Sequence, residues 1–180
     1  MNAAHLHLLV NHLPVIGEIF SVLLMIYGFI RKNLEVQRAG LWAILITGIT
    51  GFVSDKTGGP AARMIHDMHL VNDAAIKVHA QAADYALMFS IISGVLALIA
   101  LILYRGVPPK AAGKPARIFL VGAFIVALFN VSVLVRTSEL GGEIRHTEMD
   151  ATPGATVEQP GAPPTAAPGG APQSTPAQGK

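Results

Sequence analysis

The chain of 180 residues contains no cysteine. This absence excludes disulfides, thiolate-bound metals, iron–sulfur clusters and cysteine nucleophiles, and it leaves the redox compartment open. Charged residues are also scarce at 13%, whereas soluble domains carry about 25%. The net charge of +2 comes without a basic stripe, so nothing indicates nucleic-acid binding. Low charge together with 52% hydrophobic residues argues against a soluble enzyme and predicts a membrane protein.

Four apolar segments account for most of the hydrophobic residues. They cover residues 13–30, 39–54, 85–104 and 118–135. A helix needs about 17–25 apolar residues to cross a bilayer, so the second segment is the marginal one. No Lys or Arg precedes the first segment and no small-residue cleavage site follows it, which is unlike a signal peptide. We therefore expect an all-α fold, with an integral membrane four-helix bundle over residues 1–150.

The composition changes after residue 150. Residues 151–180 contain seven Pro, seven Ala and five Gly but no aromatic residue. Such a segment buries too little apolar surface to offset its ordering entropy, so we expect a disordered C-terminal tail that acts as a tether or spacer. Within it, residues 161–168 leave a polyproline II ligand as an alternative.

The positive charges predict the orientation of the bundle, because positive loops stay in the cytoplasm. They gather in the first loop and the third loop, as Arg31, Lys32 and Arg38, and as Arg105, Lys110, Lys114 and Arg117. Both termini are then on the outer, periplasmic side of a bacterial inner membrane. All seven histidines fall on that same side, namely His5, His7, His12, His66, His69, His79 and His146.

Helical periodicity places the polar residues of the first segment on one face. This face consists of His7, Asn11, Pro14, Glu18, Ser21, Met25 and Gly28. Glu18 lies inside the apolar segment, where a carboxylate costs about 3 kcal/mol on insertion scales and usually faces a cavity or a partner. We expect Glu18 to be a proton carrier and the candidate catalytic residue, paired with an outer-side histidine, Lys56 or Arg136.

The third segment, read as one helix over residues 72–104, has a face of small residues that favours close helix packing. The face consists of Ala75, His79, Ala82, Ala83, Ala86, Ser90, Gly94 and Ala97. His79 continues this face beyond the apolar segment. We therefore expect its side chain to point into the bundle near the membrane surface.

Neutral imidazole is a common ligand of haem iron, zinc and copper. His12 and His79 come at similar depth on two segments, so we predict a haem b site between them, with His7 as the substitute for His12. His66, His69 and His146 are the candidates for a second site that takes a divalent metal, zinc or copper. No compact metal motif supports either site. The alternative is that the histidines are ordinary interfacial residues and no cofactor binds.

Four short blocks carry a resemblance to a known family. They are HLLVNHLP at 7–14, TGGPA at 57–61, HAQAA at 79–83 and GGEIRH at 141–146, where the glycine pair is expected to end a helix. Over residues 4–146 the chain resembles a family of small bacterial membrane proteins with four predicted helices and no assigned biochemical function. The resemblance implies the architecture rather than an activity. In layout alone the chain is also similar to four-helix b-type cytochromes, which is an analogy.

Three functions follow from these residues as hypotheses. The first is a membrane redox protein, in which haem b near the outer face exchanges electrons with a quinone and Glu18 accepts protons. The second is a non-catalytic subunit or assembly factor of a larger membrane complex, with its histidines binding a divalent metal or nothing. The third, motivated by Glu18 alone, is a proton-coupled transporter, which with four helices per chain requires a homodimer.

Overall fold

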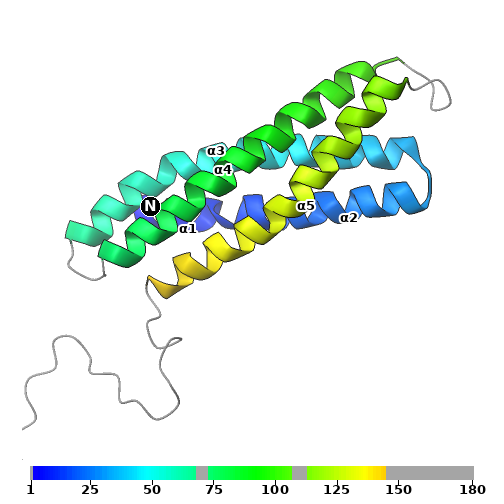
Figure 1. The fold of residues 1–180 in the computed structure, drawn as a ribbon. Coiled ribbons are helices and arrows are strands. Elements are labelled where there is room, and N and C mark those ends of the chain that lie inside the picture. Colours follow the sequence, from blue (N-terminus) through cyan, green and yellow to red (C-terminus); the bar gives the residue numbers. More distant parts are fainter. Residues whose placement is uncertain (1, 68–72, 107–112, 145–180) are drawn as a thin grey trace, which may run out of the picture. The chain divides into compact units, whose positions relative to one another are not determined.

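The computed structural model describes residues 2–67, 73–106 and 113–144, and this part of the chain is almost entirely helical, with no strand (Figure 1). Its helices are α1 (Ala3–Val10), α2 (His12–Ile30), α3 (Leu34–Asp67), α4 (Asp73–Leu103) and α5 (Lys114–Glu143). The expected all-α class is confirmed. The predicted tail, residues 151–180, lies outside the described residues.

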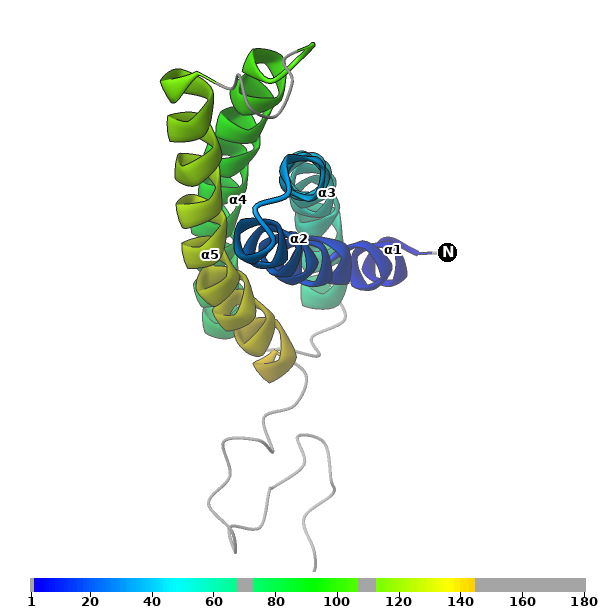
Figure 2. The same ribbon diagram turned by 90° about the vertical axis from the view of Figure 1, so that its right-hand side faces the viewer.

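The four long helices form a bundle in which α2 packs on α3, α3 on α4, α4 on α5 and α5 on α2 (Figures 1 and 2). The short helix α1 packs mainly along α3. We call one end of the bundle the histidine end, where α1 and α4 begin and α5 ends. The opposite end is the arginine end, where Arg31 follows α2 and Arg105 follows α4.

A break at Asn11 separates α1 from α2, and Pro14 explains it. Proline lacks a backbone N–H and its ring clashes with the carbonyl four residues earlier, which here belongs to Val10, the last residue of α1. The start of α1 is capped by Asn2, whose side-chain oxygen accepts the backbone N–H of His5 at 2.9 Å. The break sets the direction in which α1 leaves α2 and reaches α3.

Two expectations about helix ends are wrong. The helix of the second apolar segment does not end near residue 54, because α3 continues to Asp67; the start of α4 at Asp73, by contrast, agrees with the helix expected over residues 72–104. Pro60 lies inside α3, close to Thr57, whose hydroxyl oxygen contacts His7 of α1. Gly141 and Gly142 do not end a helix either, since α5 continues through them to Glu143. Glycine permits a helix to end but does not force it to.

The surface and interior of the bundle have the polarity of a membrane protein. Four helical stretches, the first of them α1 and α2 together, are long and apolar enough to cross a membrane. Large apolar side chains cover the outside: Leu9, Ile16, Ile30 and Ile118 are between 65% and 71% exposed. Polar side chains are instead buried, namely Glu18, Ser21, Thr47, Ser90, Ser93 and Asn130.

The apolar core fills the half of the bundle nearer the arginine end. Its fully buried members include Met25 of α2, Leu41 and Ile44 of α3, and Leu120 of α5. Gly40 makes this packing possible, because a Cβ there would come within 2.7 Å of the Met25 sulfur. Glu18 and the candidate ligand histidines therefore lie outside this core, toward the histidine end.

Candidate functional site

The tautomer of His7 follows from its hydrogen-bond partners. Its Nδ1 lies 2.9 Å from the Thr57 hydroxyl oxygen, and that hydroxyl donates its own proton to the backbone oxygen of Ser54 at 2.7 Å. The Thr57 oxygen is therefore the acceptor in the contact with His7, and Nδ1 carries the proton. The second ring nitrogen, Nε2, then has a lone pair for a ligand.

His79 has the same arrangement on the opposite side of the histidine end. Its Nδ1 lies 3.0 Å from the backbone oxygen of Thr137, which can only accept, so Nδ1 donates. Nε2 is again the atom with the lone pair. This pattern, in which one ring nitrogen donates to a fixed acceptor and the other is left for a metal, is the one found at metal-bound histidines.

Each imidazole lies against a glycine, and the contact is tight enough to require one only at His79. The ring of His7 rests on Gly58 of α3, where a built Cβ would lie 3.5 Å from Cε1, and the ring of His79 rests on Gly141 of α5, where the corresponding distance is 3.0 Å. Both side chains are half-buried, and they are close enough to interact electrostatically. His7 and His79 thus form a pair at the histidine end, held by α3 and α5.

The other predicted histidines lie elsewhere. His12 is exposed and its Nδ1 contacts the backbone oxygen of Leu8 in its own chain segment at 2.9 Å, so the structure brings His7 rather than His12 toward His79. His66 is exposed and pairs with Asp73 at 3.5 Å. His69 and His146 lie outside the described residues. Within those described, no three His, Asp or Glu side chains come together as a metal site.

Glu18 lies in a fully buried polar cluster made by three helices. The side-chain nitrogen of Asn130 on α5 donates to Glu18 Oε1 at 3.1 Å and to the hydroxyl of Ser90 on α4 at 2.9 Å. Glu18 and Asn130 are 0% exposed and Ser90 is 1% exposed. The partner of Glu18 is therefore an amide on α5 and not one of the cations expected from the sequence. Lys56 pairs with Asp55, and Arg136 pairs with Glu139 and Glu143.

Three buried side-chain oxygens have no hydrogen-bond partner within the described part of the chain. They are Oε2 of Glu18, Oδ1 of Asn130 and Oδ1 of Asn11. Buried polar atoms are normally satisfied by protein or by water, so each unpartnered atom indicates a group that still accepts a proton, a water or a ligand. All three belong to the same half of the bundle as the histidine pair.

Sequence periodicity identified Glu18, His7 and His79 but missed the residues that orient them. Thr57 and Thr137 supply the acceptors for the imidazoles, Gly141 supplies the space for His79, and Gly58 lies in contact with His7. A threonine or glycine is common on any helix face, so only the relative placement of α3, α4 and α5 reveals these roles. The four blocks that carry the family resemblance each supply a residue at this end of the bundle.

Comparison with known proteins adds no assignment. No family model, no curated protein and no solved structure matches the chain.

Proposed function

We propose that this protein is a multi-pass protein of the bacterial inner membrane that binds haem b at the histidine end and takes part in electron transfer. His7 and His79 are the ligands in this proposal, through Nε2. In this proposal the histidine end is on the periplasmic side, as the distribution of positive charges in the loops predicts. A membrane quinone or a larger membrane complex is then the electron partner.

The observation that carries the proposal is the matched tautomer of the two imidazoles. In both rings Nδ1 donates to an acceptor that cannot rotate away easily, a threonine hydroxyl already bonded to its own helix and a backbone carbonyl. Such outer partners fix the ring orientation and raise the basicity of the ligand nitrogen. Two unrelated surface histidines would not be expected to share this arrangement at the same end of the bundle.

Haem b held by two histidines supplies reversible one-electron transfer, with a potential set by ligands, burial and nearby hydrogen bonds. The chain's contribution is to hold the imidazoles and to limit access of water. The half-buried position of both rings and the apolar side chains around the bundle suit that role.

The test is an absorption spectrum of the full-length protein, purified in detergent from haem-replete cells, first air-oxidised and then reduced with dithionite. We expect a sharp Soret band that shifts on reduction, with resolved α and β bands. His7→Ala and His79→Ala are expected to abolish it. His5→Ala and His12→Ala are the matched controls, because both side chains are exposed at the same end. A colourless wild-type protein would contradict the proposal, and metal analysis would then test for zinc or copper.

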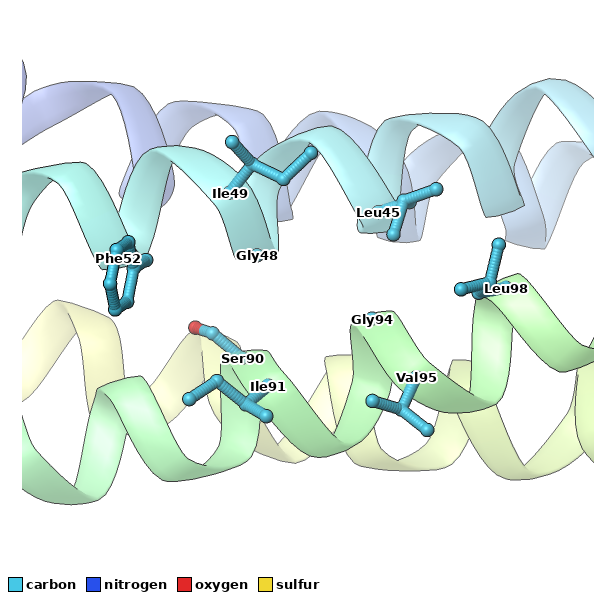
Figure 3. Close-up of a pocket in the computed structure, with 9 residues that line it drawn as sticks. All are labelled: Leu45, Gly48, Ile49, Phe52, Ser90, Ile91, Gly94, Val95 and Leu98. Carbon is cyan, nitrogen blue, oxygen red and sulfur yellow. The ribbon is translucent and has the colours of Figure 1, made fainter.

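A groove between α3 and α4 favours the second candidate, a subunit that packs against other membrane helices. The groove has a volume of about 270 Å³ and is lined almost wholly by apolar residues (Figure 3). Gly48 and Gly94 lie along it, and no atom comes within 4 Å of a Cβ built on Gly94. Small residues let helices approach closely in lipid.

This candidate predicts that the protein purifies in a mild detergent with one fixed set of membrane partners, or as a homodimer, without a bound cofactor. Gly94→Leu, which fills the groove, is expected to release them. Gly59→Leu serves as the control, because Gly59 is also a helical glycine with open space around it but lies outside the groove. Partners retained by Gly94→Leu would exclude this groove as the contact.

A further inference from the structure

A carboxyl group stands alone inside the apolar bundle, and its surroundings indicate what it binds. Among the residues that the structure describes as buried, Glu18 is the one acidic or basic side chain of the Asp, Glu, His, Lys and Arg types. The polar groups around it are neutral: Asn130 on α5 bonds to its carboxyl group, and Ser90 on α4 bonds to the same Asn130 amide. On α3, the neutral Thr47 lies against Gly17, the residue before Glu18. A carboxylate without a counter-charge is very unfavourable in such an interior, whereas a neutral carboxylic acid is tolerated.

The hydrogen bonds around Glu18 satisfy one of its oxygens and leave the other open. Oε1 accepts from Asn130, while Oε2 of Glu18 and Oδ1 of Asn130 are both buried without a partner. Glu18 Oε2 and Asn130 Oδ1 are both hydrogen-bond acceptors when Glu18 is ionised, so neither can donate a hydrogen bond to the other. A proton on the Glu18 carboxyl supplies the missing donor, either directly or through one water molecule.

We propose that Glu18 and Asn130 form a proton-binding site within the bilayer, and that the histidine end alone gives access to it. In the binding step a hydronium ion gives its proton to a carboxylate oxygen of Glu18, and the products are the neutral acid and a water molecule. No electron transfer or further reactant is involved. The site is separate from the histidine pair, and its existence does not depend on whether a cofactor binds there.

In the proposal, the proton reaches Glu18 from the histidine end along the face of the helix that carries Asn11. Oδ1 of Asn11 is the third buried oxygen without a partner, and Asn11 lies two helical turns before Glu18 on the same face. With about 1.5 Å of rise per residue, the two side chains are about 10 Å apart along the helix. One turn earlier is His7, whose backbone oxygen accepts the Asn11 N–H at 2.9 Å. The polar side chains of His7, Asn11 and Glu18 therefore follow one face, and the proposed route needs water molecules to span the distance between Asn11 and Glu18 past Pro14.

Beyond Glu18 the line ends in the apolar core. Met25, Leu41 and Ile44 are fully buried directly toward the arginine end, and Leu120 and Ala123 of α5 close the same layer. These side chains offer no hydrogen-bonding group to a proton. The site is thus open toward one side of the bundle and closed toward the other.

Infrared spectroscopy of the full-length protein in liposomes tests the proposal. We expect a carbonyl band of a protonated carboxyl group at neutral pH, absent in Glu18→Gln and retained in Glu139→Gln, whose carboxylate is exposed and paired with Arg136. Asn130→Leu should shift the band because a hydrogen bond to the carbonyl is lost. If wild type and Glu18→Gln give the same carboxyl region at neutral pH, Glu18 is ionised and the proposal is overturned.

Exchange into D₂O tests the route. Asn11→Leu is expected to slow the deuterium shift of the Glu18 band by about tenfold, the effect of losing one net hydrogen bond. Met25→Leu, a volume-conserving change in the apolar core, is expected to leave the rate unchanged. An Asn11→Leu protein that exchanges at the wild-type rate would overturn the access route. Glu18→Gln is nearly isosteric with the neutral acid, so unchanged thermal stability at neutral pH supports protonation independently of the spectra.

Discussion

The imidazole of His79 on α4 lies directly against Gly141 on α5, and a Cβ built on Gly141 would come within 3.0 Å of the ring carbon Cε1 and 3.3 Å of Nδ1. The same ring donates to the backbone oxygen of Thr137, one turn before that glycine. The absence of a side chain at residue 141 therefore fixes where the imidazole sits. It gives a reason for the glycine at residue 141, although within a helix glycine is less favourable than alanine by about 0.5–1 kcal/mol.

Gly141→Ala is expected to displace His79 and weaken binding at the histidine end. The methyl group must push the ring from its place, which lengthens the hydrogen bond to Thr137 and moves Nε2. Binding is measured by titrating haem, or the metal found by analysis, into the purified protein. Gly59→Ala is the matched control: it has open space around it and should bind like wild type, with equal or slightly higher stability. Equal affinities for the two variants would contradict the assigned role of Gly141.

Thr57→Val is expected to reduce affinity at the same site by about 10–100-fold, the range typical of lost outer partners of ligand histidines. Valine keeps the shape of threonine but removes the oxygen that accepts from His7 Nδ1. The imidazole then loses its fixed tautomer and orientation. Thr50→Val is the control, because the Thr50 hydroxyl bonds only to the backbone of its own helix at 2.9 Å. If Thr50→Val weakens binding as much as Thr57→Val, the hydrogen bond to His7 is not the cause.

Two glycines of the groove between α3 and α4 should respond differently to alanine. A Cβ on Gly48 would come within 3.0 Å of the backbone oxygen of Ser90, which cannot rotate away, whereas Gly94 has nothing within 4 Å. We expect Gly48→Ala to lower the free energy of unfolding by about 1–3 kcal/mol, as overpacking does. Gly94→Ala should leave it unchanged or raise it slightly. Unfolding in mixed detergent micelles, followed by circular dichroism, measures the difference; equal effects would place the tight contact elsewhere.

Hydropathy predicts the positions of the spans in this chain better than the ends of its helices. Residues 13–30 correspond closely to α2 (His12–Ile30), and residues 85–104 and 118–135 lie largely within α4 and α5. A helix that crosses a bilayer needs a long apolar run, and hydropathy detects these runs. The polar turns at the C-terminal end of α3 lie beyond them and are not expected to be helical, whereas helical periodicity does extend the third segment back to residue 72, one residue before α4 begins.

Periodicity likewise predicts the faces but not the partners. Glu18 and Ser21 share the buried face of α2, and Ser90 and Gly94 that of α4, as expected from three- and four-residue spacing. Glu18 meets Asn130, a residue 112 positions later in the chain. This contact depends on how α5 is placed along α2. Three- and four-residue spacing within one helix does not give that register between two helices.

The orientation predicted from the positive loops has a direct test, because the chain has no cysteine that would label in the background. Single cysteines are introduced at His5, exposed at the histidine end, and at Gly113, exposed at the arginine end. We expect a membrane-impermeant maleimide to label His5→Cys in intact spheroplasts and Gly113→Cys only after permeabilisation. Labelling in the reverse order would place the histidine pair on the cytoplasmic side and contradict the positive-inside assignment.

The contact between Glu18 and Asn130 is expected to show coupling in a double-mutant cycle. Asn130→Leu removes the only donor that the structure shows for Glu18 Oε1. The buried carboxyl group of Glu18 and the buried hydroxyl of Ser90 each lose a hydrogen bond. Each such group left unsatisfied costs about 1–3 kcal/mol.

In a Glu18→Leu background, Asn130→Leu should lower the free energy of unfolding by less, because the acceptor on residue 18 has also been removed. The coupling energy expected for residues in direct contact is about 0.5–3 kcal/mol. Ser93→Ala is the control in both backgrounds, since the Ser93 hydroxyl bonds to the backbone oxygen of Ser90 and not to Glu18. Unfolding free energies of the single and double variants measure the cycle. A coupling energy near zero would mean that Asn130 does not hold Glu18, and the reason for burying a carboxyl group at this depth would have to lie in another contact.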